Sequence, residues 1–320
     1  MLTDKVIKAS PRAAYGETLI ELGHKNPNIV VFDADLSCST QTQKFAQVFP
    51  DRFFNMGVAE QDAMCTAAGI STCGKIPFVS TFAIFASGRA WDQIRNSIAY
   101  PKFNVKIVAT HGGVTVGEDG ASHQALEDIS LMRSIPNMVV IVPGDSTEAK
   151  SAIKFAAEYK GPVYIRLART NMPVIFDEDK YSFNFPKARV LVEGIDVTLL
   201  ANGETIYEAL MCAKMLADKG ILAEVINVPV IKPLDKDTII ESAKKTGAIV
   251  TIENHSIIGG LGSAVCEAIC ENNPVLVKRI GVRDEFGQSG KEHELMAEYG
   301  LTADKFIYDI IDLIERKAAC

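Results

Sequence analysis

Short apolar runs rich in valine and isoleucine alternate with longer amphipathic stretches along the first half of the chain. Runs this apolar are expected to be covered on both faces, which is typical of a parallel sheet built from strand–helix–strand units. The apolar runs predict strands at residues 28–32, 75–81, 105–110, 137–142 and 162–167. The stretches between them predict helices at residues 11–24, 60–72, 87–100, 123–133 and 147–159.

This rhythm breaks at residues 171–187, a segment with two prolines, an acidic run and no clean period. We interpret the segment as an interdomain linker. The expected fold class is α/β, with two doubly wound domains, largely parallel sheets and a separately packed core in each. The domains are expected at residues 1–187, with the linker included, and at residues 188–320. Four further strands are predicted in the second domain, at residues 197–201, 223–228, 248–253 and 274–280.

Composition narrows the functional class. The 320 residues carry a net charge of −7, and 48% of them are hydrophobic and 23% charged, as in ordinary globular proteins. The acidic balance argues against a general nucleic-acid or membrane surface. Seven cysteines without CxxC spacing favour reduced thiols over a disulfide framework, and neither a signal peptide nor a bilayer-spanning run is recognisable. We therefore expect a cytoplasmic protein without nucleic-acid or membrane partners.

Candidate chemistry is concentrated in residues 111–127, HGGVTVGEDGASHQALE, directly after one of the expected strands. The segment contains two histidines, His111 and His123, together with acids and glycines. Ligands bind at the carboxyl ends of strands in α/β sheets, and histidine is suited to moving protons near neutral pH. The segment is therefore predicted to be a catalytic loop.

Other candidates follow the neighbouring strands, and each has a purely structural alternative. DADLSCS, residues 33–39, could hold a ligand or cap the next helix. Glu60 in NMGVAEQDA could serve chemistry or stabilise a helix N-terminus. Phe82 and Phe85 in STFAIF could carry a ligand or pack in a core. Arg169 in RLARTNMP could bind a phosphate or form a surface ion pair.

Taken in order, GVAEQ, STFAIF, HxxxxxGEDGxxHQxxE and RLARTNMP resemble the transketolases. The resemblance covers essentially the whole chain, but only two domains of that family: the pyrimidine-binding domain at residues 1–187 and the C-terminal domain at residues 188–320. GEDG followed by HQ is the most specific motif, whereas GVAEQ also occurs in related thiamine enzymes. The resemblance implies a thiamine diphosphate-dependent enzyme that transfers a two-carbon ketol unit from a ketose phosphate to an aldose phosphate.

The resemblance also implies which residues bind the cofactor. Glu60 matches the glutamate that hydrogen-bonds N1′ of the aminopyrimidine, where a proton favours the tautomer that removes the C2 proton of the thiazolium. Phe85 matches the aromatic residue that stacks on the pyrimidine, with Phe82 beside it. Asp35 and Leu36 match positions that line the cofactor pocket.

For the sugar, the resemblance implies a phosphate clamp and a reacting centre. Asp119 matches the acid that binds a substrate hydroxyl. His123 matches the histidine beside the reacting carbonyl, where it would stabilise the developing alkoxide or move its proton. The residues that match the phosphate clamp are Arg12, Ser39, His111 and Arg169. The expected catalytic residues are Glu60, His111 and His123.

Two departures from the family pattern bear on substrate range. After His111 the family usually has a polar pair, where this chain has Gly112 and Gly113, so contacts to the donor phosphate are expected to differ. A tyrosine common near the pyrimidine is replaced by Gly88, which weakens that wall of the pocket. Both departures affect substrate range more than reaction type.

A larger departure concerns the diphosphate-binding half of thiamine enzymes, whose mark is GDG with an asparagine downstream. GEDG at residues 117–120 belongs to the sugar loop instead, and GGLG at residues 259–262 lacks the GxGxxG pattern of a dinucleotide site. The diphosphate-binding half also holds the divalent metal, Mg²⁺ or Ca²⁺, so we expect no metal ligand in this chain. We expect that half on a separate N-terminal subunit, with activity only in a hetero-oligomer, an α2β2 heterotetramer.

Two other interpretations remain open. A related thiamine enzyme, either a 1-deoxyxylulose-5-phosphate synthase fragment or a 2-oxoacid dehydrogenase E1 β subunit, would share some motifs. An acyl-transferring β subunit, however, needs no sugar-phosphate clamp. A non-catalytic homologue that only binds a partner would have no need of Glu60, Asp119 and His123 together.

Overall fold

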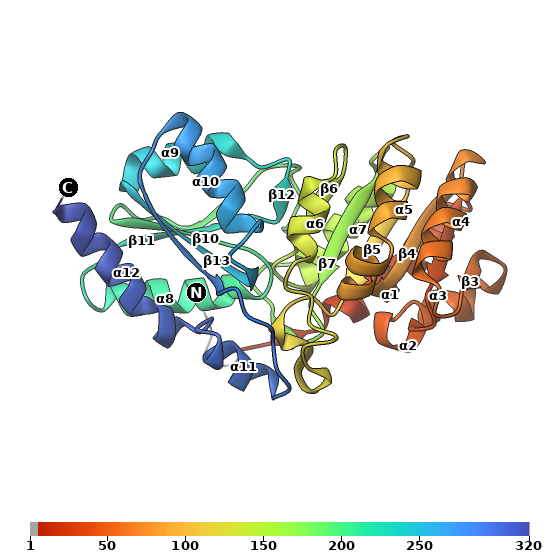
Figure 1. Ribbon diagram of the computed structural model, residues 1–320, viewed down its shortest axis with the longest axis horizontal. Helices are drawn as coiled ribbons and strands as arrows, with labels where there is room; N and C mark the ends of the chain where they lie inside the picture. The colour runs from red at the N-terminus through yellow and green to blue at the C-terminus, as the bar shows by residue number, and fades with distance from the viewer. Residues whose placement is uncertain (1–5, 320) are drawn as a thin grey trace.

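Two twisted sheets covered by helices form the part of the chain that the computed structural model describes, residues 6–319 (Figure 1). The seven-stranded sheet has the order β12-β6-β7-β5-β4-β2-β3, and the five-stranded sheet has the order β14-β13-β10-β11-β9. Neighbouring strands in both are parallel except for β12 with β6 and β9 with β11. The expected α/β class with largely parallel sheets is confirmed.

The larger sheet contains all five strands expected in the first half, with ends that differ by no more than two residues. Its strands are β2 (Ile29–Asp33), β3 (Phe53–Asn55), β4 (Ile76–Phe82), β5 (Lys106–Thr110), β6 (Val139–Ile141), β7 (Val163–Leu167) and β12 (Val230–Lys232). The helices around it are α1 (Pro11–Lys25), α2 (Ser37–Thr40), α3 (Gln43–Val48), α4 (Glu60–Thr72), α5 (Trp91–Gln93), α6 (Asp128–Ser134) and α7 (Ser146–Glu158).

Strand β2 shows how the larger sheet is covered on both faces. Ile29 and Val31 pack into the cluster that contains α1, α3 and α7, whereas Val30 and Phe32 pack into the cluster that contains α4 and α6. Because side chains alternate along a strand, a fully apolar run serves both layers at once. All five residues of β2 are buried, as the sequence pattern predicts.

The smaller sheet contains the four strands expected in the second half and an edge strand, β9, that the pattern did not predict. Its strands are β9 (Arg189–Val192), β10 (Val197–Ala201), β11 (Ala223–Asn227), β13 (Ala248–Ser256) and β14 (Leu276–Val282). Its helices are α8 (Thr205–Ala217), α9 (Lys236–Thr246), α10 (Leu261–Asn272), α11 (Glu292–Glu298) and α12 (Ala303–Ala318). Helices α8 and α12 pack on one face, and α9 and α10 pack on the other.

The expectation of a separately packed core in each domain is wrong. One continuous apolar cluster extends from Val30 and Ile107 in the larger sheet to Leu200 and Ile249 in the smaller one. Strand β12, from the second half of the chain, also joins the larger sheet antiparallel to β6. The division into residues 1–187 and 188–320 remains a prediction.

The segment at 171–187, expected to be a linker, is packed against the first domain. It contains β8 (Met172–Pro173), which pairs antiparallel with β1 (Lys8–Ala9). Further along, the ring of Phe185 stacks on that of Phe155 in α7 at 4.6 Å between centroids. A segment without a clean period can therefore still be fixed by a few aromatic contacts.

Two expected helices differ from the structure. The helix expected at 123–133 begins only at Asp128, because the backbone before it pairs with the preceding loop: Gly113 N donates to Ala125 O at 2.9 Å. The helix expected at 87–100 begins earlier and is irregular, with π-helical turns at Phe85–Arg89 and Ile94–Ala99 around α5. Such turns are frequent at functional sites.

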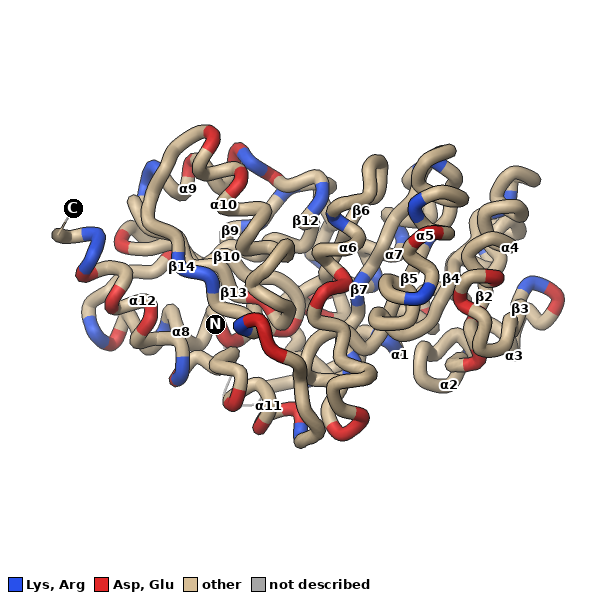
Figure 2. Tube along the Cα trace, viewed as in Figure 1, with Lys and Arg blue, Asp and Glu red and all other residues tan. Residues whose placement is uncertain are grey.

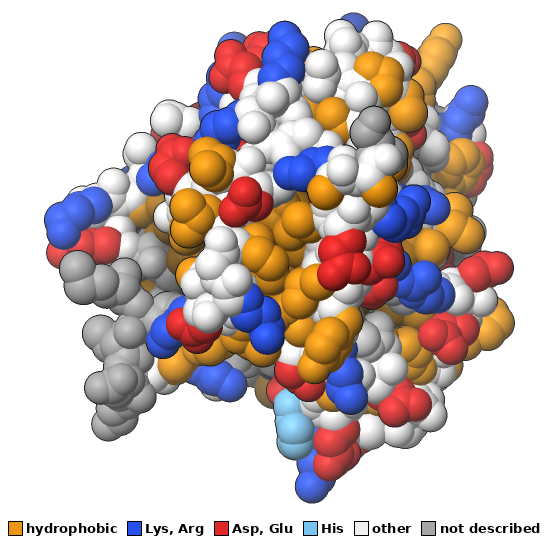
Figure 3. Space-filling view, turned by 90° about the vertical axis from the view of Figure 1, so that its left-hand side faces the viewer, with side chains coloured by type: hydrophobic (Ala, Val, Ile, Leu, Met, Phe, Trp, Pro, Cys, Tyr) orange, Lys and Arg blue, Asp and Glu red, His pale blue; other side chains and the backbone are white. Residues whose placement is uncertain are grey.

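Charged positions of both signs are interspersed along the two halves of the chain (Figure 2). The end of the molecule formed by the second domain shows apolar side chains among charged ones (Figure 3). Over residues 6–319, no helix is both long enough and apolar enough to cross a lipid bilayer.

Candidate active site

The candidate residues lie at one edge of the larger sheet, where parallel strands end. Asp35 follows β2, Phe82 ends β4, His111 follows β5 and Arg169 follows β7. Strand β3 lies on one side of β2 and β4 lies on the other, so the chain changes direction across the sheet at this point. The crevice outside the carboxyl ends at such a reversal is where doubly wound sheets bind ligands.

Glu60 is the first residue of α4 and is only 4% exposed. Its Oε1 accepts a hydrogen bond from Arg89 Nη1 at 2.9 Å, and no other side chain among residues 6–319 hydrogen-bonds this carboxylate. The Arg89 guanidinium also lies over the Phe85 ring, 4.1 Å from its centroid. Arg89 was not among the predicted site residues, although its spacing four residues after Phe85 on a helix could have indicated this contact.

Four aromatic rings form a cluster that Arg89 connects to Glu60. The Phe82 ring stacks on His111 at 3.7 Å between centroids and lies 5.7 Å from Phe85 with nearly parallel planes. The His123 ring lies edge-on to Phe85 at 5.5 Å. Phe82 is buried and Phe85 is partly exposed, and the Arg89 guanidinium lies over the Phe85 ring, so a ligand that stacks on Phe85 would have to share or displace this contact.

His111 is held as a neutral ring. Burial, together with the positive charges of Arg12 and Arg169, lowers the pKa of His111 from its usual 6.5 to about 3. Nδ1 lies 2.8 Å from the Thr110 hydroxyl, so a ring that accepts from Thr110 keeps an Nε2–H to donate. The backbone of His111 has φ of 63°, a left-handed conformation that costs of order 1–3 kcal/mol and is concentrated at functional sites.

Arg12 and Arg169 are neighbouring guanidinium groups whose hydrogen-bond acceptors among residues 6–319 are backbone carbonyls. Arg12 donates from Nε and Nη2 to Arg169 O at 3.0 and 2.7 Å, and from Nη1 to Ser39 O at 2.5 Å. Arg169 Nη1 donates to Val116 O. Within residues 6–319, no carboxylate lies within ion-pair distance of either arginine. Burial and the proximity of Arg169 both lower the pKa of Arg12. Glu292 opposes this lowering of the pKa of Arg12 but lies outside ion-pair distance. Two guanidinium groups without an ion-pair partner among the described residues are chemically suited to an anion.

Asp35 and Leu36 lie in the turn after β2. Asp35 has φ of 64° and accepts a hydrogen bond from Asn55 Nδ2 at 2.9 Å. The turn is fixed from below by Asp33, whose Oδ1 accepts Leu36 N at 2.6 Å and whose Oδ2 accepts the hydroxyl of Thr40 at 2.7 Å. Burial raises the pKa of this supporting carboxyl. Both candidates are therefore held in a defined conformation at the sheet edge.

Asp119 and His123 lie on the loop that follows β5. Asp119 ends a 3₁₀ segment, Val114–Asp119, and its exposed carboxylate contacts no other candidate side chain among the described residues. His123 is half-buried, with Nδ1 2.9 Å from the Ser122 hydroxyl. The structure thus brings His123 to the aromatic cluster and leaves Asp119 apart from it.

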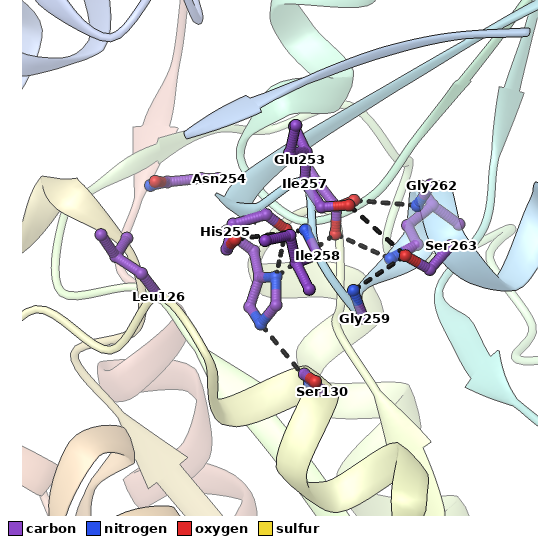
Figure 4. A network of polar contacts seen from close by, with 12 residues as sticks. Leu126, Ser130, Glu253, Asn254, His255, Ile257, Ile258, Gly259, Gly262 and Ser263 are labelled. Carbon is purple, nitrogen blue, oxygen red and sulfur yellow. Dashed lines mark hydrogen bonds and ion pairs between the residues drawn. The ribbon is translucent and has the colours of Figure 1, made fainter. Parts of the chain in front are cut away.

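The glycine-rich GGLG segment holds an internal carboxylate, not an open phosphate site. Glu253 accepts Leu261 N and Gly262 N at 2.7 and 2.8 Å, which places a negative charge at the N-terminus of α10 (Figure 4). His255 lies beside it, fully buried, with Nε2 3.4 Å from Ser130 N of the first domain. His255 is therefore part of the junction between the domains.

Within the part of the chain that the structure describes, neither a metal-binding cluster nor a further pocket adds to these candidate residues. Among residues 6–319 no group of three or more His, Cys, Asp or Glu side chains is arranged to hold a metal ion, and the location of the metal remains a prediction. An apolar groove of about 540 Å³ lies elsewhere. It is lined by residues 174–176, by β9 and by α8. It contains none of the candidate residues.

Comparison with known proteins identifies the family of this chain. Residues 8–174 match the family described as transketolase, pyrimidine binding domain, and residues 186–306 match transketolase, C-terminal domain. A putative transketolase C-terminal section from Methanocaldococcus jannaschii is 53% identical over 309 residues, which are 96% of each chain. A 6-deoxy-6-sulfo-D-fructose transketolase subunit from Clostridium sp. (strain MSTE9) is 44% identical over 96% of this chain and 95% of that one.

A solved structure described as split gene transketolase, inactive beta4 tetramer, is 52% identical with a TM-score of 0.90, over 96% of this chain and 99% of that chain. The chain therefore belongs to the transketolase family. It corresponds to the C-terminal subunit, with the pyrimidine-binding and C-terminal domains, and the family resemblance seen in the sequence motifs is confirmed.

Proposed function

We propose that this chain is the C-terminal subunit of a split, thiamine diphosphate-dependent transketolase that transfers a two-carbon ketol unit from a ketose phosphate to an aldose phosphate. The observation that carries the proposal is a juxtaposition at one sheet edge. A buried carboxylate and a partly exposed aromatic ring lie at the same sheet edge as two arginines that have no carboxylate within ion-pair distance among residues 6–319. The carboxylate and the ring suit an aminopyrimidine, and the two arginines suit a phosphate.

The residues present fit the pyrimidine end of the cofactor. Glu60 is buried, and the described residues hydrogen-bond it only through Arg89, so the carboxylate can still accept from a ring nitrogen. The partly exposed Phe85 ring lies parallel to Phe82, and the pyrimidine would replace or join the Arg89 guanidinium that lies over it. When bound, thiamine diphosphate supplies a carbon nucleophile and an electron sink for the two-carbon unit. Glu60 would hold a proton at N1′, and Phe85 would orient the ring.

The remaining residues would act on the sugar. Arg12 and Arg169 would bind its phosphate, with the neutral His111 donating a hydrogen bond and Ser39 beside them. His123 would hold or move a proton at the reacting oxygen. Asp119 would bind a hydroxyl of the substrate. Gly88, where an added Cβ would meet no atom within 4 Å, leaves this side of the pocket open.

A second subunit completes the proposal. The partner would carry the diphosphate-binding domain and hold Mg²⁺ or Ca²⁺, and the two would assemble as an α2β2 heterotetramer. Support comes from the relative described as an inactive β4 tetramer of a split gene transketolase, and from the relative described as a transketolase subunit. Because the latter is described as acting on a sulfosugar, the sugars used by this chain need direct measurement.

The test is reconstitution. The isolated chain should show no ketol transfer, and addition of a subunit with the diphosphate-binding domain, thiamine diphosphate and Mg²⁺ should restore it with sugar phosphates. The assay follows the two-carbon shortened and extended sugars by mass spectrometry. Robust transfer by the isolated chain would contradict the split-subunit assignment. A reconstituted complex that decarboxylates a 2-oxoacid but transfers no ketol unit would favour the related thiamine enzymes.

A further inference from the structure

The smaller sheet reverses its strand order at its own carboxyl edge, and the loop after β5 covers this position. Strand β11 lies beyond β10 on one side and β14 lies beyond β13 on the other, so the reversal falls between β10 and β13. In a doubly wound domain this is the place for a ligand. Here Glu204, just after β10, and Asn254, in β13, contact the loop that starts at Gly113.

These contacts hold consecutive residues of the loop. Asn254, 2% exposed, accepts Val114 N on Oδ1 at 2.9 Å and donates from Nδ2 to Glu204 Oε1. The Thr115 hydroxyl donates to the same Glu204 oxygen at 2.8 Å. In Figure 4 the Asn254 side chain extends away from the Glu253–His255 pair. Asn254 and Glu204 therefore serve the loop and not the network around α10.

The two glycines that depart from the family pattern make this approach possible. Gly113 has φ of +83°, and a Cβ at this position would collide with the Asn254 amide. A Cβ at Gly112 would collide with the Arg166 guanidinium, whose Nη2 donates to Asn254 O at 2.9 Å. Glycine permits both the left-handed backbone and the close contact.

The loop in turn holds the phosphate clamp. The carbonyl of Val116, one residue beyond Thr115, accepts Arg169 Nη1, and the Arg169 carbonyl accepts two bonds from Arg12. We propose that Asn254 and Glu204 are positioning residues of the second domain, which fix residues 113–116 so that the Val116 carbonyl orients the Arg169 guanidinium for phosphate. The identity of the ligand as phosphate rests on the proposed function.

The first test measures the loop in the full chain without any turnover. In Asn254→Ala, hydrogen–deuterium exchange of the peptide that contains Val114 and Thr115 should be at least about tenfold faster, because a buried amide loses its acceptor. The matched control is Glu267→Gln, which weakens the ion pair with Arg133 across the same domain junction (2.6 Å) but does not contact this loop. Equal exchange in wild type and Asn254→Ala would overturn the proposal.

The second test measures the clamp. In the reconstituted enzyme, Asn254→Ala should raise KM about tenfold for an aldopentose 5-phosphate acceptor, with kcat and the KM of the unphosphorylated aldopentose nearly unchanged. Glu204→Ala should act in the same direction, and Glu204→Gln should restore the KM because its carbonyl still accepts from Asn254 and Thr115. Arg169→Ala should raise the KM of the phosphorylated acceptor the most, because it removes the guanidinium itself. Equal changes in KM for both acceptors would overturn the proposal.

A third measurement separates this proposal from the proposed function. Inorganic phosphate, titrated into the full chain and followed by ³¹P NMR, should bind about tenfold more weakly to Asn254→Ala than to wild type, and least to Arg169→Ala. If the wild-type complex transfers no ketol unit but this order holds, the proposed function fails and the positioning role stands. If phosphate binds wild type and Asn254→Ala equally, the positioning role is wrong whatever the activity.

Discussion

At the carboxyl edge of the larger sheet, Arg12 and Arg169 donate only to backbone carbonyls and the Glu60 carboxylate keeps hydrogen-bonding capacity. At the carboxyl edge of the smaller sheet, Glu204 and Asn254 are bonded to each other and to the loop that covers them. Both edges belong to α/β sheets of the same kind. At the first edge two arginines have no ion-pair partner among the described residues, whereas at the second edge Glu204 and Asn254 are hydrogen-bonded within the chain.

This difference distinguishes an edge that can bind a ligand from an edge whose polar groups hold a loop in place. Fold alone places a candidate crevice at each sheet, and only the state of the side chains tells them apart. Polar groups that are satisfied within the chain stabilise a conformation, whereas charges without partners leave interaction energy for a ligand. Three substitutions test whether activity and stability divide between the two edges in this way.

The largest effect is expected at the first edge, on activity. In the reconstituted enzyme, Glu60→Ala should slow deuterium exchange at C2 of bound thiamine diphosphate by roughly 10²–10⁴-fold, the usual contribution of a positioned acid or base. ¹H NMR after acid quench measures the rate. Asp62→Ala, an exposed acid in the same first turn of α4, is the control and should leave the rate unchanged. An unchanged rate in Glu60→Ala would leave this carboxylate only its favourable interaction with the N-terminus of α4.

The second largest effect is expected on the free energy of unfolding, at the buried ion pair that connects the two sheet edges. Asp128 is fully buried and pairs with Arg166 at 3.0 Å, and the same guanidinium donates to the Asn254 carbonyl. Asp128→Ala should lower the free energy of unfolding by roughly 3–5 kcal/mol, because a buried cation loses its partner. Urea unfolding followed by circular dichroism measures the loss. The exposed pair Asp177–Lys180 is the control.

Asp177→Ala should leave the free energy of unfolding nearly unchanged, because an exposed ion pair contributes little to stability. If the two variants lost similar free energy, the buried pair would not be what holds the edges together. If Asp128→Ala abolished C2 exchange while the chain stayed folded, the division between an active edge and a supporting one would be too simple.

The smallest effect is expected on the pH dependence of the unfolding free energy. It concerns Glu148, which lies where the first domain, the 171–187 segment and the second domain meet. Burial raises the pKa of Glu148 to about 7, where it meets Tyr181 and Asn227 of the linker and the second domain. A carboxyl whose folded pKa is raised contributes stability that is present below its unfolded pKa and lost as pH rises through the folded value. Stability attributable to Glu148 should therefore fall between pH 4.5 and about 7, by roughly 3 kcal/mol.

Glu148→Gln, which keeps the shape without the charge, should remove this decline. The difference in unfolding free energy between wild type and variant, measured from pH 4.5 to 7.5, gives the result directly. Glu158→Gln, an exposed position on the same helix, should reproduce the wild-type slope. Parallel pH curves for wild type and Glu148→Gln would show that the buried carboxyl does not oppose folding at neutral pH.

Much of the first edge could be predicted from the sequence, because local patterns determine it. The apolar runs located β2, β4, β5 and β7 to within two residues, and polar candidates that directly follow these strands necessarily gather at one edge. Glu60 at the start of α4 and the Phe82–Phe85 pair are also local features. The contact of Arg89 with Glu60 joins residues 29 positions apart and was missed.

The rest depends on contacts between distant parts of the chain. His123 was expected at a helix start, but the pairing of Gly113 with Ala125 prevents a helix there. Asn254 and Val114 are 140 positions apart, so no periodic pattern could connect them. Strand β9 pairs antiparallel at a half-exposed edge, where the short run Arg189–Val192 carries little hydrophobic signal.

Strand β12 limits where a gene for this enzyme can be divided. The chain returns from the second domain to add Val230–Lys232 beside β6, a strand whose three residues are all buried. A break near residue 187 would produce a first fragment with that apolar strand uncovered at the sheet edge, and uncovered edges promote association with other strands. The two domains described here would thus have to be inherited together, even in a family whose subunits can be encoded apart.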